Sequence, residues 1–590
     1  MADGRGATAA IGFDRIRRDL SARSMSDDDG REGRQSLLGD STRFCRWLVL
    51  GCVLVSTPVV GWRGKDMSER LATADEGFSM ASNHTVLSAT ERDTAIVVSV
   101  PSIDALHAET RSTLFYQPSK ARSGDFMPYH HQGRFYLFHI LMDGADDAGI
   151  PWHLISTEDF VTFTDHGVAL PAGGKEDQDH NVFTGSVMFV AGMHHIFYTG
   201  NNLAFPDQGK PGQGVMHAVS SDLVRWTKIP EDTFFARTDI YEPHDWRDPF
   251  VFWNEDSKQY WMLVTARLKT GPSRRRGCLA LCTSTDLKRW NVQAPFWAPG
   301  LFHGLECPDL FQMGQQWYLI FSEYSDEFRT RYRFSDSLHG PWLTPEDDVF
   351  DARAFYAAKS VSDGRRRYLC GWTPPRKESR DYGSWEFGGN LMVHQLQQRK
   401  NGALTAGICE AINECLASTA TIEFSTTQCH IDQNADRVTI NAHHSFGYAI
   451  AGTMPDRCKL ETKVTFCSGT RGFGLVLRAS DDLDASYAVC VDPQAQRLRF
   501  DCWLPGYDFR TGNIVNLTER LGALAGMERK APVTTGTPVS LRLVVDDSIF
   551  VVYLDDAIAM TGRMYEMAVG RWGLFVDQGS ATFTEIRMSM

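Results

Sequence analysis

Two stretches with the same pattern, "HAVSSDLVRW" (217–226) and "LCTSTDLKRW" (281–290), decide the fold of this chain. Each closes an apolar-polar strand, passes through a Ser/Thr-Asp turn and ends at a tryptophan. Such alternation predicts a half-buried strand, and Ser, Thr and Asp favour the turn that follows it. Two further copies are "HLISTEDFVTF" (153–163) and "YRFSDSLHGPW" (332–342).

The acidic residues of the four copies, Asp159, Asp222, Asp286 and Asp336, lie 50 to 64 residues apart. Between the copies stand further strand-like segments: "GRFYLFHIL", "HHIFYTGN", "KQYWMLVTA", "QQWYLIFSE" and "RRRYLCGW". Self-similarity at this period, with several strands in each unit, is typical of a β-propeller. We therefore predict five blades over residues 112–400, with the repeated motif acting as a blade turn.

The last part of the chain, residues 401–590, carries a different pattern. Its strand-like segments are separated by turn signals at short intervals, as in "KLETKVTF", "GFGLVLRA", "VSLRLVVDDSIFVVYLDD" and "GRWGLFVD". This spacing is typical of a β-sandwich. The sequence thus predicts an all-β protein, a five-bladed β-propeller followed by a C-terminal β-sandwich, with an N-terminal membrane-anchor segment.

The start of the chain differs in composition from the rest. Residues 1–43 are rich in Arg, Asp, Ser and Gly, which is typical of a disordered tail. Residues 44–63 hold an uncharged run with a tryptophan at each end, bracketed by Arg46 and Arg63. This run predicts a transmembrane signal anchor rather than a cleaved signal peptide, whose n-region would be about 46 residues long. Residues 64–111 form a polar linker.

An anchor would place the rest of the chain outside the cell or in a vacuole or secretory lumen, with or without release by processing. Two sequons, "NHT" from Asn83 and "NLT" from Asn516, would lie on that side. Of the 13 cysteines, Cys45 and Cys52 belong to the anchor. An odd number remains, so at least one thiol would stay unpaired or pair between chains. The formal net charge of −13 argues against nucleic-acid binding.

Three acidic residues stand at matching places of different units, on or beside apolar runs. They are Asp125 in "SGDFMPYHH", Asp248 in "WRDPFVF" and Glu306 in "GLECPDLF". The inner strand ends of a propeller meet at a central funnel, where glycoside hydrolysis needs an acid and a second carboxylate. Each residue alone also fits a turn or a salt bridge, and only the joint pattern favours catalysis. The apolar flanks of Glu306 predict a raised pKa, so that it could donate a proton near neutral pH.

The order of several motifs resembles glycoside hydrolase family 32, the family of invertases and fructan hydrolases. The similar segments are "WHLISTEDF" (152–160), "FTGS" (183–186), the Arg-Asp-Pro of "WRDPFVF" (246–252), the Glu-Cys of "ECPD" (306–309), the Tyr-Ala-x-Lys of "DARAFYAAKSV" (351–361) and the strand pair "LRLVVDDSIFVVYLDD" (541–556). One such motif is a weak signal, but six in the family's order are a strong one.

The resemblance implies a propeller with an appended sandwich and a retaining reaction through a covalent fructosyl–enzyme intermediate. By position, Asp125 would be the nucleophile and Glu306 the general acid and later the base. Asp248, oriented by Arg247, would bind fructose hydroxyls and stabilise the oxocarbenium-like transition state. Cys307 would help to tune the acid beside it.

The same motif segments suggest residues that bind the substrate. Trp152, Phe183 and Ser186 are predicted here, although the aromatic residues, like Trp246 and Trp372, also fit packing between blades. No metal and no cofactor is implied. The expected partners are sucrose or a β-fructan and, through the anchor, a membrane, whereas the oligomeric state stays open.

The first motif departs from the family pattern. The family's Trp-Met-Asn-Asp-Pro-Asn-Gly is replaced by "SGDFMPYHH", so that Gly124 stands where Asn is usual and no Trp precedes it. Asp125 is retained as the predicted nucleophile, and Asp143 in "LMDGADD" is the fallback. The change puts the choice of substrate in doubt.

The predicted function is release of terminal β-D-fructofuranose from sucrose or a β-fructan. One alternative is a fructosyltransferase that uses the same intermediate. Another is a catalytically silent glycan-binding propeller, although a binding protein has no need of three carboxylates. A third is a five-bladed glycosidase that acts on arabinose or mannose.

Overall fold

The computed structural model describes residues 110–144, 148–426, 430–434, 437–503 and 526–590. The predicted tail, the anchor at 44–63, nearly all of the linker and both sequons lie outside these residues. Within them, none of the helices is long and apolar enough to cross a membrane. The described cysteines are all free thiols, most of them buried.

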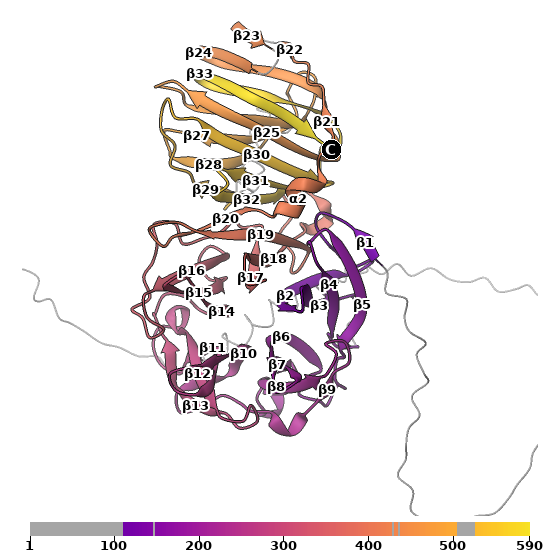
Figure 1. Ribbon diagram of the computed structural model, residues 1–590, viewed down its shortest axis with the longest axis vertical. Helices are drawn as coiled ribbons and strands as arrows, with labels where there is room; N and C mark the ends of the chain where they lie inside the picture. Colours follow the sequence, from indigo (N-terminus) through magenta and orange to yellow (C-terminus); the bar gives the residue numbers. More distant parts are fainter. Residues whose placement is uncertain (1–109, 145–147, 427–429, 435–436, 504–525) are drawn as a thin grey trace, which may run out of the picture. The chain divides into compact units, whose positions relative to one another are not determined.

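Five antiparallel sheets follow one another along the chain and stand around a common centre (Figure 1). They confirm the predicted five-bladed propeller. The first blade comprises β1 (Thr110–Ser112), β2 (Arg122–His131), β3 (Arg134–Met142), β4 (Trp152–Thr157) and β5 (Thr162–Leu170), and the second β6 (Asn181–Val190), β7 (Met193–Asn201), β8 (Gln213–Ser220) and β9 (Thr227–Lys228).

The remaining blades have the same order from the inner strand outward. The third comprises β10 (Tyr241–Asn254), β11 (Gln259–Leu268), β12 (Gly277–Ser284) and β13 (Asn291–Trp297), the fourth β14 (Glu306–Met313), β15 (Gln316–Glu323) and β16 (Arg329–Ser335), and the fifth β17 (Tyr356–Ser362), β18 (Arg367–Thr373), β19 (Asn390–Gln398) and β20 (Leu404–Ile408). The predicted division after residue 400 falls between β19 and β20.

The helices within the described residues are short. They are η1 (Pro206–Gln208), η2 (Pro230–Asp232), η3 (Ser273–Arg275), η4 (Lys377–Ser379) and α2 (Glu410–Cys415).

The repeated sequence motif forms the turn after the third strand of a blade. In the second blade, one carboxylate oxygen of Asp222 accepts the backbone N–H groups of Val224 and Arg225. Leu223, between Asp222 and Val224, adopts a left-handed φ of 66°. The copies at Asp159 and Asp286 make the same turn. These contacts explain the motif as a structural one, because Asp side chains close such turns on their own backbone.

The C-terminal part forms the predicted sandwich. Its strands are β21 (Thr419–Ala420), β22 (Ser425–Thr426), β23 (His430–Asn434), β24 (Arg437–Thr453), β25 (Arg457–Phe466), β26 (Gly472–Ala479), β27 (Ser486–Asp492), β28 (Arg497–Trp503), β29 (Glu528–Lys530), β30 (Val539–Asp546), β31 (Ile549–Leu554), β32 (Ile558–Arg563) and β33 (Arg571–Ser589).

The long strand β33 connects the two layers of the sandwich. Its first half pairs with β26 and its second half with β25, while β24 runs along most of its length. Apolar side chains of both layers form a single core between them, with Leu475, Val489 and Leu543 among its fully buried members. The predicted strand pair at 541–556 is the hairpin of β30 and β31.

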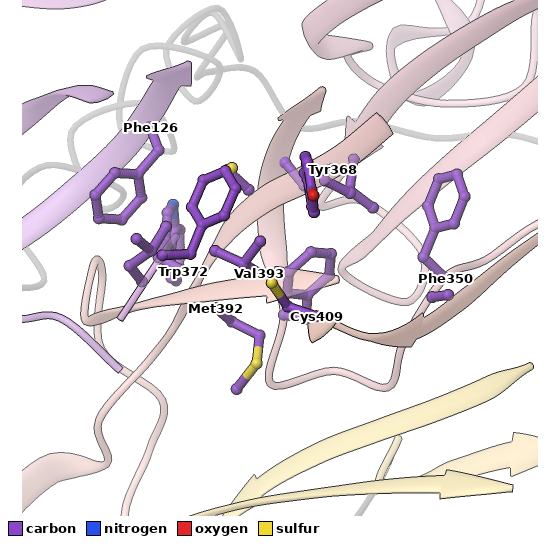
Figure 2. Close-up of a cluster of buried hydrophobic side chains, with 14 of the residues drawn as sticks. Phe126, Phe350, Tyr368, Trp372, Met392, Val393 and Cys409 are labelled. Carbon is purple, nitrogen blue, oxygen red and sulfur yellow. The ribbon is translucent and has the colours of Figure 1, made fainter. Parts of the chain in front are cut away.

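A second core cluster joins the fifth blade to the sandwich. It holds Trp372 and Cys409 of the propeller part (Figure 2) together with Val551 and Tyr553 of β31. Beside it, the buried Asp351 accepts hydrogen bonds from the backbone and hydroxyl of Thr561. The two folds therefore meet through both apolar and polar contacts.

Candidate active site

Each of the five inner strands carries a β-bulge at the same level. In every case the inner strand has one residue more than its partner strand, as the register shifts between Ser123 and Phe126, Phe183 and Gly185, Arg247 and Phe250, Glu306 and Asp309, and Tyr356 and Lys359 show. Bulges redirect side chains and are common beside active sites. The bulges contain Asp125, Thr184, Asp248, Cys307 and Ala357.

Asp125 is 9% exposed and lies in the bulge of β2. The indole Nε1 of Trp372 donates to its Oδ1 at 2.8 Å, and the hydroxyl of Thr184 donates to its Oδ2. Burial raises the pKa of Asp125, and the negative charge of Asp248 adds to this, against the lowering effect of the hydrogen bonds. The donors fix the carboxylate in one orientation.

Asp248 lies in the bulge of β10 with a left-handed φ of 57° and is nearly fully buried. Its Oδ2 accepts the backbone N–H of Cys307 at 2.9 Å and the Thr265 hydroxyl at 3.3 Å. Its own N–H donates to Thr199 at 2.8 Å. An Asp adopts this backbone conformation more readily than most residues, and here it aims the carboxylate at the next blade.

Glu306 is the first residue of β14, and its side chain is 22% exposed. Arg247 Nη2 donates to Oε1 at 3.1 Å, and the Tyr356 hydroxyl donates to Oε2 at 2.6 Å. Burial raises the pKa of Glu306 to about 7, as its apolar flanks predict, although Arg247 and the Tyr356 hydrogen bond act in the opposite direction. A carboxyl with this pKa can hold a proton near neutral pH and give it up.

Cys307 links the three carboxylates. It follows Glu306 in the chain, its backbone N–H reaches Asp248, and its Sγ lies 3.6 Å from Asp125 Oδ2. Burial, followed by the charges of Asp125 and Asp248, raises the pKa of the thiol well above its ordinary value. The thiol therefore stays neutral and serves as a donor to Asp125.

Two of the predicted substrate-binding residues are buried and hydrogen-bonded within the protein. Trp152 has no exposed surface and donates its indole N–H to the carbonyl oxygen of Phe183 at 3.1 Å. The Ser186 hydroxyl accepts the N–H of Val251 and ties β6 to β10. In this structure both side chains are buried and make packing contacts, and their substrate-binding roles stay predictions. Phe183 itself is partly exposed.

The remaining candidates are also placed by the structure. Trp246 and Trp372 are fully buried, and only Trp372 contacts a carboxylate of the site. The fallback residue Asp143 is exposed directly after β3, the second strand of its blade. Asp125, by contrast, contacts Cys307 and Thr184 at the inner strands, and it stays the predicted nucleophile.

Three residues that contact Asp125, Glu306 or Arg247 were not predicted from the sequence. Thr184 lies inside "FTGS" and Tyr356 inside the Tyr-Ala-x-Lys segment, but neither received a role. Asp245, two residues before Arg247, accepts its Nη1 at 2.8 Å. The motif order could have singled out Thr184 and Tyr356, whereas the contact of Asp245 depends on the fold.

Gly124, next to Asp125 in the chain, is held by close packing. A Cβ at this position would lie 2.8 Å from Ile140 Cβ and 3.0 Å from a ring carbon of Phe387. We expect Gly124→Ala to lower the free energy of unfolding by about 1–3 kcal/mol, because neither neighbour can move without disturbing the core. Urea denaturation measures this, and an unchanged midpoint would show that the pocket wall is looser than the structure indicates.

Comparisons with known proteins agree with this architecture. A family model described as "Glycosyl hydrolases family 32 N-terminal domain" matches residues 125–413, and one described as "Glycosyl hydrolases family 32 C terminal" matches residues 419–589. Together they span the propeller, including all three carboxylates, and the sandwich.

Individual relatives are similar at low identity. The chain is 30% identical over 245 residues to a sucrose-6-phosphate hydrolase of Vibrio alginolyticus, covering 38% of this chain and 47% of that enzyme. It is 21% identical over 512 residues to the levanbiose-producing levanase of Bacillus subtilis, covering 80% of this chain and 89% of the levanase.

Among solved structures, fructan 1-exohydrolase IIa of Cichorium intybus superposes with a TM-score of 0.60 and 18% identity, covering 81% of this chain and 97% of that one. This likeness concerns the fold. With both family models matched in order over most of the chain, the protein belongs to glycoside hydrolase family 32 and is a glycoside hydrolase of the β-fructofuranosidase type.

Proposed function

We propose that this enzyme releases terminal β-D-fructofuranose from sucrose or a β-fructan by a double displacement with retention. The observation that carries the proposal is the junction at Cys307, which contacts both Asp125 and Asp248 and directly follows Glu306. It brings a hydrogen-bonded carboxylate and a carboxyl of raised pKa next to the same residue. A retaining glycosidase needs these two groups in different protonation states.

In the first step, Asp125 Oδ attacks the anomeric carbon of fructose as the bond from that carbon to the leaving oxygen breaks. Glu306 gives its proton to the leaving oxygen, so glucose or the shortened fructan departs as a neutral alcohol. A fructosyl ester on Asp125 and an ionised Glu306 remain. The hydrogen bonds from Trp372 and Thr184 hold Asp125 in place for the attack.

In the second step, Glu306 removes a proton from water, and the water oxygen attacks the anomeric carbon. The ester bond to Asp125 breaks, fructose leaves, and both carboxyl groups return to their starting states. Asp248 is close enough to interact electrostatically with both residues, so its negative charge stabilises the positive charge that develops on the sugar ring in both transition states.

The two carboxyl groups predict a bell-shaped dependence of kcat/KM on pH. Asp125 must be ionised, and its pKa is raised, so activity is lost as pH falls through a value above that of an ordinary Asp. Glu306 must be protonated, so activity is lost as pH rises through about 7. Initial rates across a pH series measure both limbs, and an alkaline limb far above this value would rule out Glu306 as the acid.

The experiment that tests the function is a product analysis. The full-length chain is incubated separately with sucrose, sucrose 6-phosphate, inulin and levan, and free fructose and glucose are assayed, with Glu306→Gln as the control. Fructose release that is lost in the variant supports the proposal and identifies the substrate. Glucose in excess of fructose points to a fructosyltransferase, and a folded protein that releases neither sugar refutes the proposal.

A further inference from the structure

Behind Glu306 lies a row of six side chains with alternating charge, here called the charge ladder. Arg247 contacts Glu306 at 3.1 Å and Asp245 at 2.8 Å. Arg267 contacts Asp245 at 3.4 Å and Glu242 at 2.8 Å. Arg276 closes the ladder with a contact to Glu242 at 2.8 Å. The ladder thus leads from the proposed catalytic acid to the loop after η3.

The middle of the ladder is rigid and shielded from solvent. The Arg267 side chain is 3% exposed, and its Nη1 also donates to the carbonyl oxygen of His303 at 2.7 Å. Asp245 uses Oδ1 for Arg247 and Oδ2 for Arg267. Burial acts to raise the pKa of Asp245, but the charge and hydrogen bond of Arg247 outweigh it and hold the pKa below its ordinary value. Asp245 is therefore an anion shared between two guanidinium groups.

We propose that Asp245 and Arg267 are positioning residues for the reaction: they hold the Arg247 guanidinium against Glu306 and, by sharing its charge, set the pH range in which Glu306 is an acid. The inference rests on the proposed function of Glu306. Neither residue touches the reacting atoms. They act through Arg247, which would otherwise present its whole positive charge to Glu306.

The other groups around Glu306 are accounted for. Asp125 faces it from β2, Asp248 from β10 and the Tyr356 hydroxyl from β17, and Cys307 follows it on β14. Tyr324, after β15, lies near Arg247. These groups are not substituted in the variants described below. A shift in the alkaline limb of the pH profile of kcat/KM therefore results from the change in the charge ladder.

His303 also lies close to the ladder. Burial, with the charge of Arg267 next, lowers its pKa to about 4. It is therefore neutral over the alkaline limb and does not contribute a titration there.

The proposal predicts that Asp245→Asn and Arg267→Gln shift the alkaline limb of the pH profile of kcat/KM in opposite directions. Asp245→Asn keeps an acceptor for Arg247 but removes an anion, so Arg247 stabilises ionised Glu306 more strongly and the limb moves to lower pH. Arg267→Gln removes the cation that competes for Asp245, so Asp245 offsets Arg247 more fully and the limb moves to higher pH. We expect each shift to be about half to one pH unit, because buried charges are weakly screened.

The experiment measures kcat/KM against pH for the full-length parent, both variants and Asp179→Asn. Asp179 is a matched control, since it is a buried carboxylate paired with Lys228 in the second blade. We expect no shift in Asp179→Asn. Structural damage would lower rates without moving the limb in opposite directions.

Several outcomes overturn the inference: an unmoved limb in Asp245→Asn, shifts of the same sign in both variants, or an equal shift in Asp179→Asn. If Arg267→Gln does not fold, Arg267→Lys replaces it. This variant keeps the charge and should leave the limb in place, and a shift equal to that of Asp245→Asn would contradict the proposal. A parent that releases no fructose refutes the proposed function instead, so the two failures are distinct.

Discussion

Replacing Asp125 by Asn is expected to lower kcat by about 10⁴- to 10⁶-fold, the loss typical of removing a nucleophile. The amide is similar in size but cannot form the ester intermediate. Trp372 can still donate to the remaining carbonyl oxygen, so the pocket should persist. Fructose release from the preferred substrate measures the loss over long incubations.

Two controls make this result specific. Asp179→Asn removes another buried carboxylate and should retain most of the activity. Asp143→Asn tests the fallback nucleophile and should also remain active, since Asp143 lies exposed after β3. Loss of activity in Asp143→Asn with retention in Asp125→Asn would reverse the assignment. Thermal unfolding of each variant confirms that the protein is folded.

Replacing Glu306 by Gln is expected to lower kcat on sucrose or fructan by about 10²- to 10⁴-fold, the usual contribution of a general acid. Gln keeps the shape of Glu and can still accept hydrogen bonds from Arg247 or Tyr356, but it cannot give a proton to the leaving oxygen. The substitution therefore slows the first step for substrates with a poor leaving group, such as a sugar alkoxide.

The matched test uses an activated substrate, p-nitrophenyl β-D-fructofuranoside, whose leaving group needs no proton. Its first step, seen as a burst of p-nitrophenol, should be nearly as fast in Glu306→Gln as in the parent, while steady turnover is slowed for lack of a base. If Glu306→Gln slows the first step equally for the activated substrate and for sucrose or fructan, this would argue that Glu306 only supports the fold.

Much of the fold could be predicted because it depends on local patterns. The turns at Asp159, Asp222 and Asp286 are closed by their own neighbours, so their residues carry the signal. The hairpin of β30 and β31 is equally local. The course of β33 between two layers could not be predicted, because its partners β24, β25 and β26 are distant in the sequence.

The site was predictable only in its charged residues. Asp125, Asp248 and Glu306 stood out as acids beside apolar runs, and the bulges that bring them together cannot be read from composition. The burial of Trp152 and Ser186 could not be predicted, because a motif shows which residues recur but not which of them the fold covers. Asp245 was missed because its role depends on Arg267, a residue of the neighbouring strand.

Asp125, despite its altered motif, is the proposed nucleophile. The most direct measurement is to mix Glu306→Gln with p-nitrophenyl β-D-fructofuranoside, quench, digest with pepsin and search the peptides by mass spectrometry. We expect one added fructosyl group on a peptide that contains Asp125, and no such group in Asp125→Asn/Glu306→Gln. An adduct on another residue, or steady release of p-nitrophenol without any adduct in the burst phase, would contradict it.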